Sequence, residues 1–240
     1  MLSLSDSPNW AQVEKAIAKA LSLSACACLV DSPAGSVVDT IKDFFVARNF
    51  QVAQDGRLCS ELGDAVAQRK VWTLCSQVAK PTDGWLQRYT ALQTQSLPMA
   101  PYLRNSKEVK ADEWLELEDL VIDPRIRPRT ACLPKVAAKA GIDGAEILVY
   151  SISGPTPTLS QAHKRKGVNG ILLLDPKGAK SGVRALHGLE FWRLHGGKDS
   201  VWTEKNRDQL VFQATRSMPV SSARKAAIAA MKEIDATRPE

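Results

Sequence analysis

Apolar side chains in the first half of the chain alternate between helical and strand-like spacing. They recur every three or four positions in 9–21 and again in 37–48, which predicts two amphipathic helices. Short apolar runs at 25–30 and 50–53 predict two strands, each closed by turn residues. The order indicates a βαβ-like unit, in which the loop 33–36 is either a phosphate site at the start of a helix or a simple loop.

The apolar spacing in 57–96 predicts further helices, interrupted by a proline and a glycine in 80–84. The prolines in 97–101 then prevent any helix from continuing, because each restricts itself and the residue before it. A polar stretch follows directly. We therefore expect an N-terminal α/β or mostly helical domain at 1–100, a linker at 101–111 and a second domain at 112–240.

Strand-like patterns concentrate in the second half of the chain. They occupy 114–122, 146–152, 170–174, 189–194 and 209–214. Helical patterns occupy 133–140, 181–187 and the alanine-rich 221–234. The fold class expected for the chain is α/β, with α+β as the alternative, and the second domain should hold a mixed sheet and a C-terminal helix.

The composition is that of an ordinary globular protein, with 240 residues, 44% apolar and 24% charged. No run approaches the roughly 18 apolar residues of a membrane span, and the polar start does not resemble a secretory signal. We expect a cytoplasmic protein without membrane insertion. An odd number of cysteines and three late histidines argue against a disulfide framework and a zinc site. The cysteines, expected to be reduced and mostly buried, are Cys26, Cys28, Cys59, Cys75 and Cys132.

The net charge of +6 and a pI near 9.1 favour polyanionic partners. In the segment 123–129 two prolines hold the chain extended, so Arg125, Arg127 and Arg129 project to one side. Three guanidinium groups in a row match a phosphate backbone or a carboxylate cluster. The alternative is a solvated linker whose arginines pair with nearby acids, namely Glu116, Glu118 and Asp119.

A second basic patch lies between two predicted strands. It comprises Lys164, Arg165 and Lys166, and no acid occurs from 161 to 174. Such a patch gives affinity for phosphates without reading base sequence. The alternative is a solvated run of charge.

The segment 114–122, followed by Asp123-Pro124-Arg125 and Pro128-Arg129, resembles the opening of the ParB/sulfiredoxin-like domain. The resemblance covers roughly 112–232 and implies a mixed sheet in the order strand, helix, strand, strand, helix, strand. The family carries a nucleotide loop of glycine, an acid or histidine, and arginines. This chain has 175–184 in its place, without a histidine–arginine pair, a paired acid or a sulfiredoxin-type cysteine. This departure argues against nucleotide hydrolysis, nuclease activity and sulfinic acid reduction.

The same loop has phosphate-binding character of its own. A buried strand ends before it, glycines allow close backbone approach, and lysines precede a predicted helix start. It is either a phosphate loop or a basic surface turn. Its candidate residues are Asp175, Lys177, Gly178, Lys180, Ser181 and Arg184. His187 and His195 flank a predicted strand and are candidate bases, but no nucleophile motif accompanies them.

We therefore expect a nucleic-acid-associated accessory protein of a plasmid, phage or similar element. It would bind the phosphate backbone of DNA through a basic surface and act in partition, regulation or control of DNA transfer, such as fertility inhibition in conjugation. One alternative is a nucleotide-dependent or nuclease-type ParB-like enzyme, and another is an inhibitor that presents its basic strip to an acidic protein surface. The expectation leans against an enzyme. No cofactor is expected unless the loop binds a nucleotide, and the oligomeric state stays open.

Overall fold

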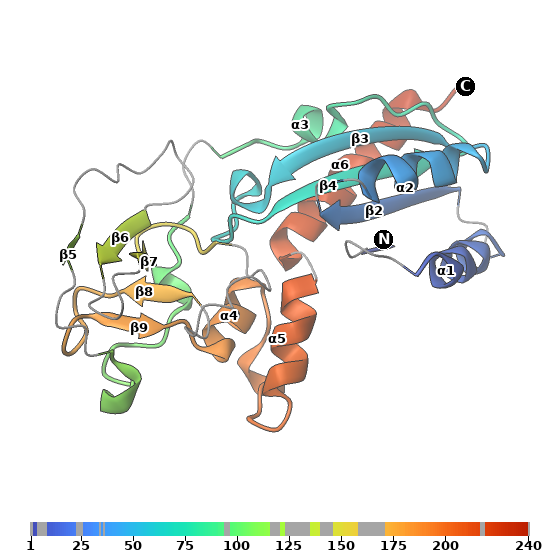
Figure 1. Ribbon diagram of the computed structural model, residues 1–240. Helices are drawn as coiled ribbons and strands as arrows, with labels where there is room; N and C mark the ends of the chain where they lie inside the picture. The colour runs from blue at the N-terminus through green and yellow to red at the C-terminus, as the bar shows by residue number, and fades with distance from the viewer. Residues whose placement is uncertain are drawn as a thin grey trace.

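The computed structural model describes residues 2–3, 9–22, 26–33, 35, 37–93, 97–115, 121–122, 135–139, 146–157, 171–216 and 219–239. In these residues helices combine with two sheets, which is the α/β fold that the sequence predicts (Figure 1). The strands of the first sheet are β1 (Leu2–Ser3), β2 (Ala27–Pro33), β3 (Gln51–Leu58) and β4 (Arg69–Ser76). Those of the second are β5 (Val121–Ile122), β6 (Lys135–Lys139), β7 (Glu146–Ser151), β8 (Leu172–Leu174) and β9 (Val183–Ala185).

The first sheet has the order β1-β2-β4-β3, with β1 parallel to β2 and the other neighbours antiparallel. Alternate side chains point to opposite faces of a strand. One face, which carries Val30 and Cys75, packs against helices α1 (Trp10–Ser22) and α2 (Val37–Val46). The other, which carries Trp72 and Leu74, packs against α3 (Trp85–Tyr89) and α6 (Val220–Thr237). Figure 1 shows α2 in front of the sheet and α6 behind it.

The last helix, α6, returns to the first sheet. Near its start the backbone N–H of Ser222 donates to the carboxylate of Asp64 at 3.1 Å, and near its end Glu233 accepts from Arg88 at 2.8 Å. Ala226 and Ala229 fill the core between the two anchors. The helix expected at 221–234 is confirmed, whereas the division into domains stays a prediction.

The second sheet has the order β5-β6-β7-β8-β9 and is mixed, because only β7 and β8 run parallel. A short parallel bridge pairs Val66, which lies between β3 and β4, with Thr156, which follows β7. The N–H of Ala67 donates to Thr156 at 2.8 Å, and the N–H of Thr156 donates to Ala65 at 2.7 Å. Remaining helices are α4 (Gly188–Leu194) and α5 (Arg207–Arg216), and the short 3₁₀ turns are η1 (Cys59–Leu62), η2 (Ala100–Tyr102), η3 (Ala111–Glu113) and η5 (Asp199–Val201).

Several local predictions are wrong. The stretch 57–96 contains the strand β4, which is buried on both faces and therefore lacks the alternation that marks a half-buried strand. The helices expected at 133–140 and 181–187 are replaced by β6 and β9, because pairing with neighbouring strands outweighs intrinsic preference. The strands expected at 189–194 and 209–214 are the helices α4 and α5.

Among the helices that the structure describes, none combines the length and apolar character needed to cross a bilayer.

Candidate functional site

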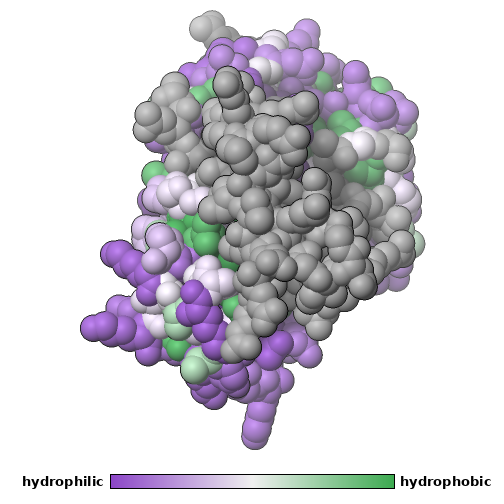
Figure 2. All heavy atoms as spheres, turned by 60° about the vertical axis from the view of Figure 1, so that its left-hand side comes forward, coloured by the Kyte–Doolittle hydropathy of each residue, from purple (hydrophilic) through white to green (hydrophobic). Residues whose placement is uncertain are grey.

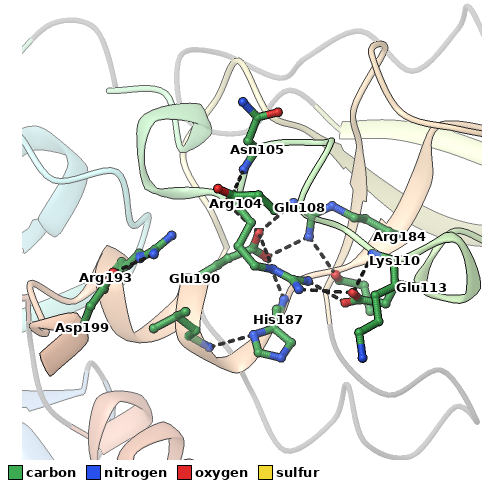
Figure 3. Close-up of polar contacts among 12 residues, drawn as sticks. Arg104, Asn105, Glu108, Lys110, Glu113, Arg184, His187, Glu190, Arg193 and Asp199 are labelled. Atoms are coloured by element: carbon green, nitrogen blue, oxygen red, sulfur yellow. Dashed lines mark hydrogen bonds and ion pairs between the residues drawn. The ribbon is translucent and has the colours of Figure 1, made fainter. Parts of the chain in front are cut away.

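A network of buried charge joins β9, α4 and the segment before the second sheet (Figure 3). At its centre, Nη1 of Arg184 donates to Oε2 of Glu190 and Nη2 donates to Oε1, both at 2.8 Å. Neither side chain is exposed to solvent. Two parallel bonds between a guanidinium and a carboxylate fix orientation as well as charge.

The carboxylate of Glu190 also accepts two backbone hydrogen bonds. The N–H groups of Arg104 and His187 donate to it, each at 2.8 Å. His187 is the N-cap of α4 and Glu190 its third residue, so the carboxylate closes a capping box where the helix dipole favours negative charge. Burial raises the pKa of Glu190, but the hydrogen bonds and charge of Arg184 outweigh it and lower the pKa overall. Glu190 is therefore held as a carboxylate that positions its neighbours.

A second ion pair continues the network towards the surface. Arg104 donates to both carboxylate oxygens of Glu113, at 3.2 and 2.6 Å, and the N–H of Lys110 donates to the same group at 3.0 Å. These hydrogen bonds, that from Arg104 above all, lower the pKa of Glu113 to about 2. Nε of Arg104 lies 3.5 Å from Glu190 and links the two pairs. Positive and negative groups thus alternate along the network, so it has little net charge to attract an anion.

His187 is the half-buried member at the edge of this network. Its Nδ1 accepts from the N–H of Leu189 at 3.3 Å, which leaves Nε2 as the protonated nitrogen of the neutral ring. Burial, helped by the charge of Arg104, lowers the pKa of His187, so the ring is neutral near pH 7. The ring of Trp202 lies beside it, with centroids 6.1 Å apart. His187 can therefore donate a hydrogen bond to a bound ligand next to an aromatic surface.

The loop predicted to bind phosphate is the hairpin turn between β8 and β9. Asp175 accepts from the N–H of Lys177 at 3.0 Å, and the hydroxyl of Ser181 donates to the carbonyl of Leu115 at 2.6 Å. A Cβ on Gly178 would lie 2.1 Å from the ring of Trp114, so this glycine is needed for packing. No helix follows the turn, which removes the helix-start argument for an anion.

The lysines of this turn, Lys177 and Lys180, are exposed, whereas Arg184 is committed to Glu190. Binding of phosphate at the turn stays a prediction. The other candidates lie outside the described residues and also stay predictions; they are Arg125, Arg127, Arg129, Lys164, Arg165 and Lys166.

The second candidate base, His195, lies in the core at the end of α4. Its Nδ1 is 3.0 Å from the carbonyl of Phe191, and burial lowers its pKa to about 4. The ring is therefore neutral and enclosed, which does not suit a base that must reach a substrate. Burial also raises the pKa of the Cys59 thiol to about 12 and that of Cys75 further, so neither is an activated nucleophile.

The sequence interpretation missed three members of the network, Arg104, Glu113 and Glu190. One signal was present, since an acid three residues after a cap is the capping-box pattern. Here the cap is His187 in place of the usual serine or threonine, and the stretch was interpreted as a strand. In the part of the chain that the structure describes, no three histidine, cysteine, aspartate or glutamate side chains gather as a metal site requires.

Comparisons with known proteins show which solved structures resemble this fold. No family model matches the chain, and no curated protein matches it. Solved structures do match the chain. The S. pombe Dnmt2 methyltransferase matches with a TM-score of 0.58 and 7% identity, over 86% of this chain and 67% of that one. A protein described as a DNA modification methyltransferase encoded within a prophage (E. coli) matches with a TM-score of 0.52 and 11% identity, over 90% and 72%.

These comparisons contradict the resemblance to the ParB/sulfiredoxin-like domain. The family order required helices at 133–140 and 181–187 and a strand at 189–194, whereas these segments contain β6, β9 and α4. The proline–arginine motif therefore occurs here outside that family's arrangement. The expectation that leaned against an enzyme is also contradicted, because the structural neighbours are methyltransferases.

Proposed function

We propose that this chain is a methyltransferase that acts on nucleic acid. The observation that carries the proposal is the likeness of its fold, over 86% of the chain, to the Dnmt2 methyltransferase. The net charge of +6 supports a polyanionic substrate. Figure 2 shows the side that carries β5–β9, where the described surface is largely hydrophilic with scattered hydrophobic areas. Partition and control of DNA transfer receive no support from these neighbours.

Methyl transfer needs a methyl donor, and the position that we propose for it is Gly35, which lies between β2 and α2. Gly35 has a φ of 147°, and among the described residues no atom lies within 4 Å of the position that a Cβ would occupy. A donor can therefore approach the backbone closely there, at the amino end of the ten-residue α2. A sulfonium donor such as S-adenosylmethionine, when bound, supplies an electrophilic methyl group.

The acceptor would be a nucleic acid base, and His187 is the residue that we propose to hold it. Its Nε2 can donate a hydrogen bond, and Trp202 offers a ring beside it. Aromatic rings bind unpaired bases by stacking, which tolerates different sequences. Glu190 and Arg184 would keep His187 in place through the capping box.

The test is transfer of a labelled methyl group from S-adenosylmethionine to single- and double-stranded DNA and RNA. We expect incorporation with the unmodified protein and its loss in Gly35→Val. Gly84→Val is the matched control, because Gly84 also has a positive φ, of 75°, with no atom within 4 Å of a Cβ. Absence of incorporation into every nucleic acid would refute the proposal. Equal loss in both variants would refute the donor position.

A further inference from the structure

The helix α6 has a line of exposed residues on the side away from the first sheet. On its inner side, Ala226 and Ala229 are buried in the core. Four exposed residues follow one another at spacings of four, three and four positions, namely Arg224, Ile228, Met231 and Asp235. An α-helix has about 3.6 residues per turn, so these four lie in one line, opposite the buried alanines. They form the outer stripe of α6.

The centre of the outer stripe is apolar. Ile228 is 44% exposed and Met231 is 67% exposed. The two side chains are one turn apart and are therefore neighbours on the helix surface. Single exposed apolar residues are common, whereas adjacent ones with a polar rim are typical of an interaction site. The patch is small, so the residues that flank it decide which partner it fits.

Charges of opposite sign flank the apolar patch. Arg224 lies one turn before Ile228, and Asp235 lies one turn after Met231. Among the described residues neither of the two charged side chains has an ion-pair partner. The outer stripe therefore presents one unpaired positive group and one unpaired negative group, at opposite ends.

The spacing of the outer stripe is the same when it is followed from either end. A second copy of α6 that lies antiparallel therefore places Ile228 opposite Met231, and the twofold axis repeats this contact. It also places Arg224 opposite Asp235 twice, so every charge of the stripe meets its opposite. A parallel copy would place each charge against its like. The charges therefore favour a second copy of this chain, in the antiparallel direction.

We propose that two copies of this chain form a dimer through the outer stripes of their α6 helices, packed antiparallel. The helix is held at both ends by the bonds of Ser222 to Asp64 and of Glu233 to Arg88, so it needs no reordering to bind. The stripe extends over only about 17 Å at 1.5 Å per residue. So small an interface gives a weak dimer that depends on protein concentration. This inference is independent of the proposed function.

The test is analytical ultracentrifugation of the full chain at increasing concentration. The mass should rise from 26.2 kDa towards twice that value. Asp235→Arg should raise the dissociation constant at least about tenfold, because Arg224 then meets a like charge in both contacts. The matched control is Asp43→Arg, which makes the same change of charge at an exposed position of α2. A chain that stays monomeric at every concentration would overturn the proposal.

Mixing two variants tests the antiparallel contact itself. Arg224→Asp alone should also weaken the dimer at least about tenfold, because two carboxylates then face each other. An equimolar mixture of Arg224→Asp and Asp235→Arg should associate about as well as the unmodified protein, since each charge meets its opposite on the other variant. A mixture no better than its separate components would show that Arg224 does not face Asp235.

The apolar centre is tested by Met231→Lys, which should raise the dissociation constant because it places a charge between the two helices. Val46→Lys is the matched control, since Val46 is 51% exposed on α2 and lies outside the stripe. Circular dichroism should show the same helix content in both variants, because both positions are exposed. An equal loss of dimer in both would mean that net charge, and not the outer stripe, controls association, and the proposal would fall.

Discussion

Arg184 and Glu190 are joined by two hydrogen bonds of 2.8 Å between side chains that solvent does not reach. The arginine lies on β9 and the glutamate on α4, and the same carboxylate holds the backbone of Arg104. Removing two charges from water costs much of what their attraction returns. The contribution of the pair is therefore geometric, because it fixes three separate segments around His187.

Glu190→Gln should destabilise the fold strongly. The variant leaves the guanidinium of Arg184 buried without its counter-charge, and such losses cost about 3–5 kcal/mol. Urea unfolding followed by tryptophan fluorescence measures the change. The matched control is Asp199→Asn. It removes the charge of an exposed carboxylate that accepts two hydrogen bonds from Arg193, at 2.9 and 2.6 Å. Exposed pairs contribute less than about 1 kcal/mol, so equal losses in both variants would contradict the structural role of Glu190.

Gly178→Ala should also destabilise the protein, because the added methyl group would lie 2.1 Å from the ring of Trp114. Overpacking of this kind costs about 1–3 kcal/mol. Gly56→Ala is the control, since its Cβ would meet Val71 at an ordinary 3.6 Å. A midpoint of thermal unfolding that falls only in Gly178→Ala supports the packing role. Unchanged stability in Gly178→Ala would show that Trp114 does not pack on the turn.

Local pattern predicted the elements whose burial is one-sided. The helices at 9–21, 37–48 and 221–234 have one apolar stripe each, and the structure confirms them. The run at 146–152 is confirmed as β7 because of its β-rich residue types, although Val149 and Tyr150 are buried on opposite faces. By contrast β4 is buried on both faces, and its position in the sheet depends on strands far away in the sequence. Burial on both faces leaves no periodic pattern of apolar and polar residues that would distinguish a strand from a helix.

The site was less predictable than the fold. Arg184 was identified from the sequence, but as an anion-binding residue at a helix start. Its partner is only six residues away, yet their contact depends on a strand at one residue and a helix at the other. Because the sequence predicts a helix at Arg184 and a strand at Glu190, it does not reveal that these two residues pair. Arg104 contributes through tertiary contact alone, which no local pattern encodes.

The basic strip remains a prediction that can be tested by salt dependence. Replacing Arg125, Arg127 and Arg129 with alanine should weaken binding about equally for all nucleic acid sequences, because phosphate contacts carry no base information. The slope of log K against log salt should fall by about 2–3 if all three contact phosphates. The control removes the same charge from the exposed lysines of α1 and α2, namely Lys15, Lys19 and Lys42. An equal loss in the control would mean that net charge alone matters.

His195 should make the stability of the protein depend on pH in a mildly acidic range. Burial lowers its pKa to about 4 in the folded state, whereas an unfolded histidine has a pKa of about 6.5. Between these values the unfolded chain binds more protons than the folded one, so the free energy of unfolding falls as the pH falls. In His195→Gln this dependence should flatten, because the variant has no group at this position that titrates. Urea unfolding at successive pH values measures it, with His187→Gln as the comparison, since the lowered pKa of that half-buried ring gives a smaller effect of the same sign. An unchanged profile in His195→Gln would show that the ring is not buried as a neutral group.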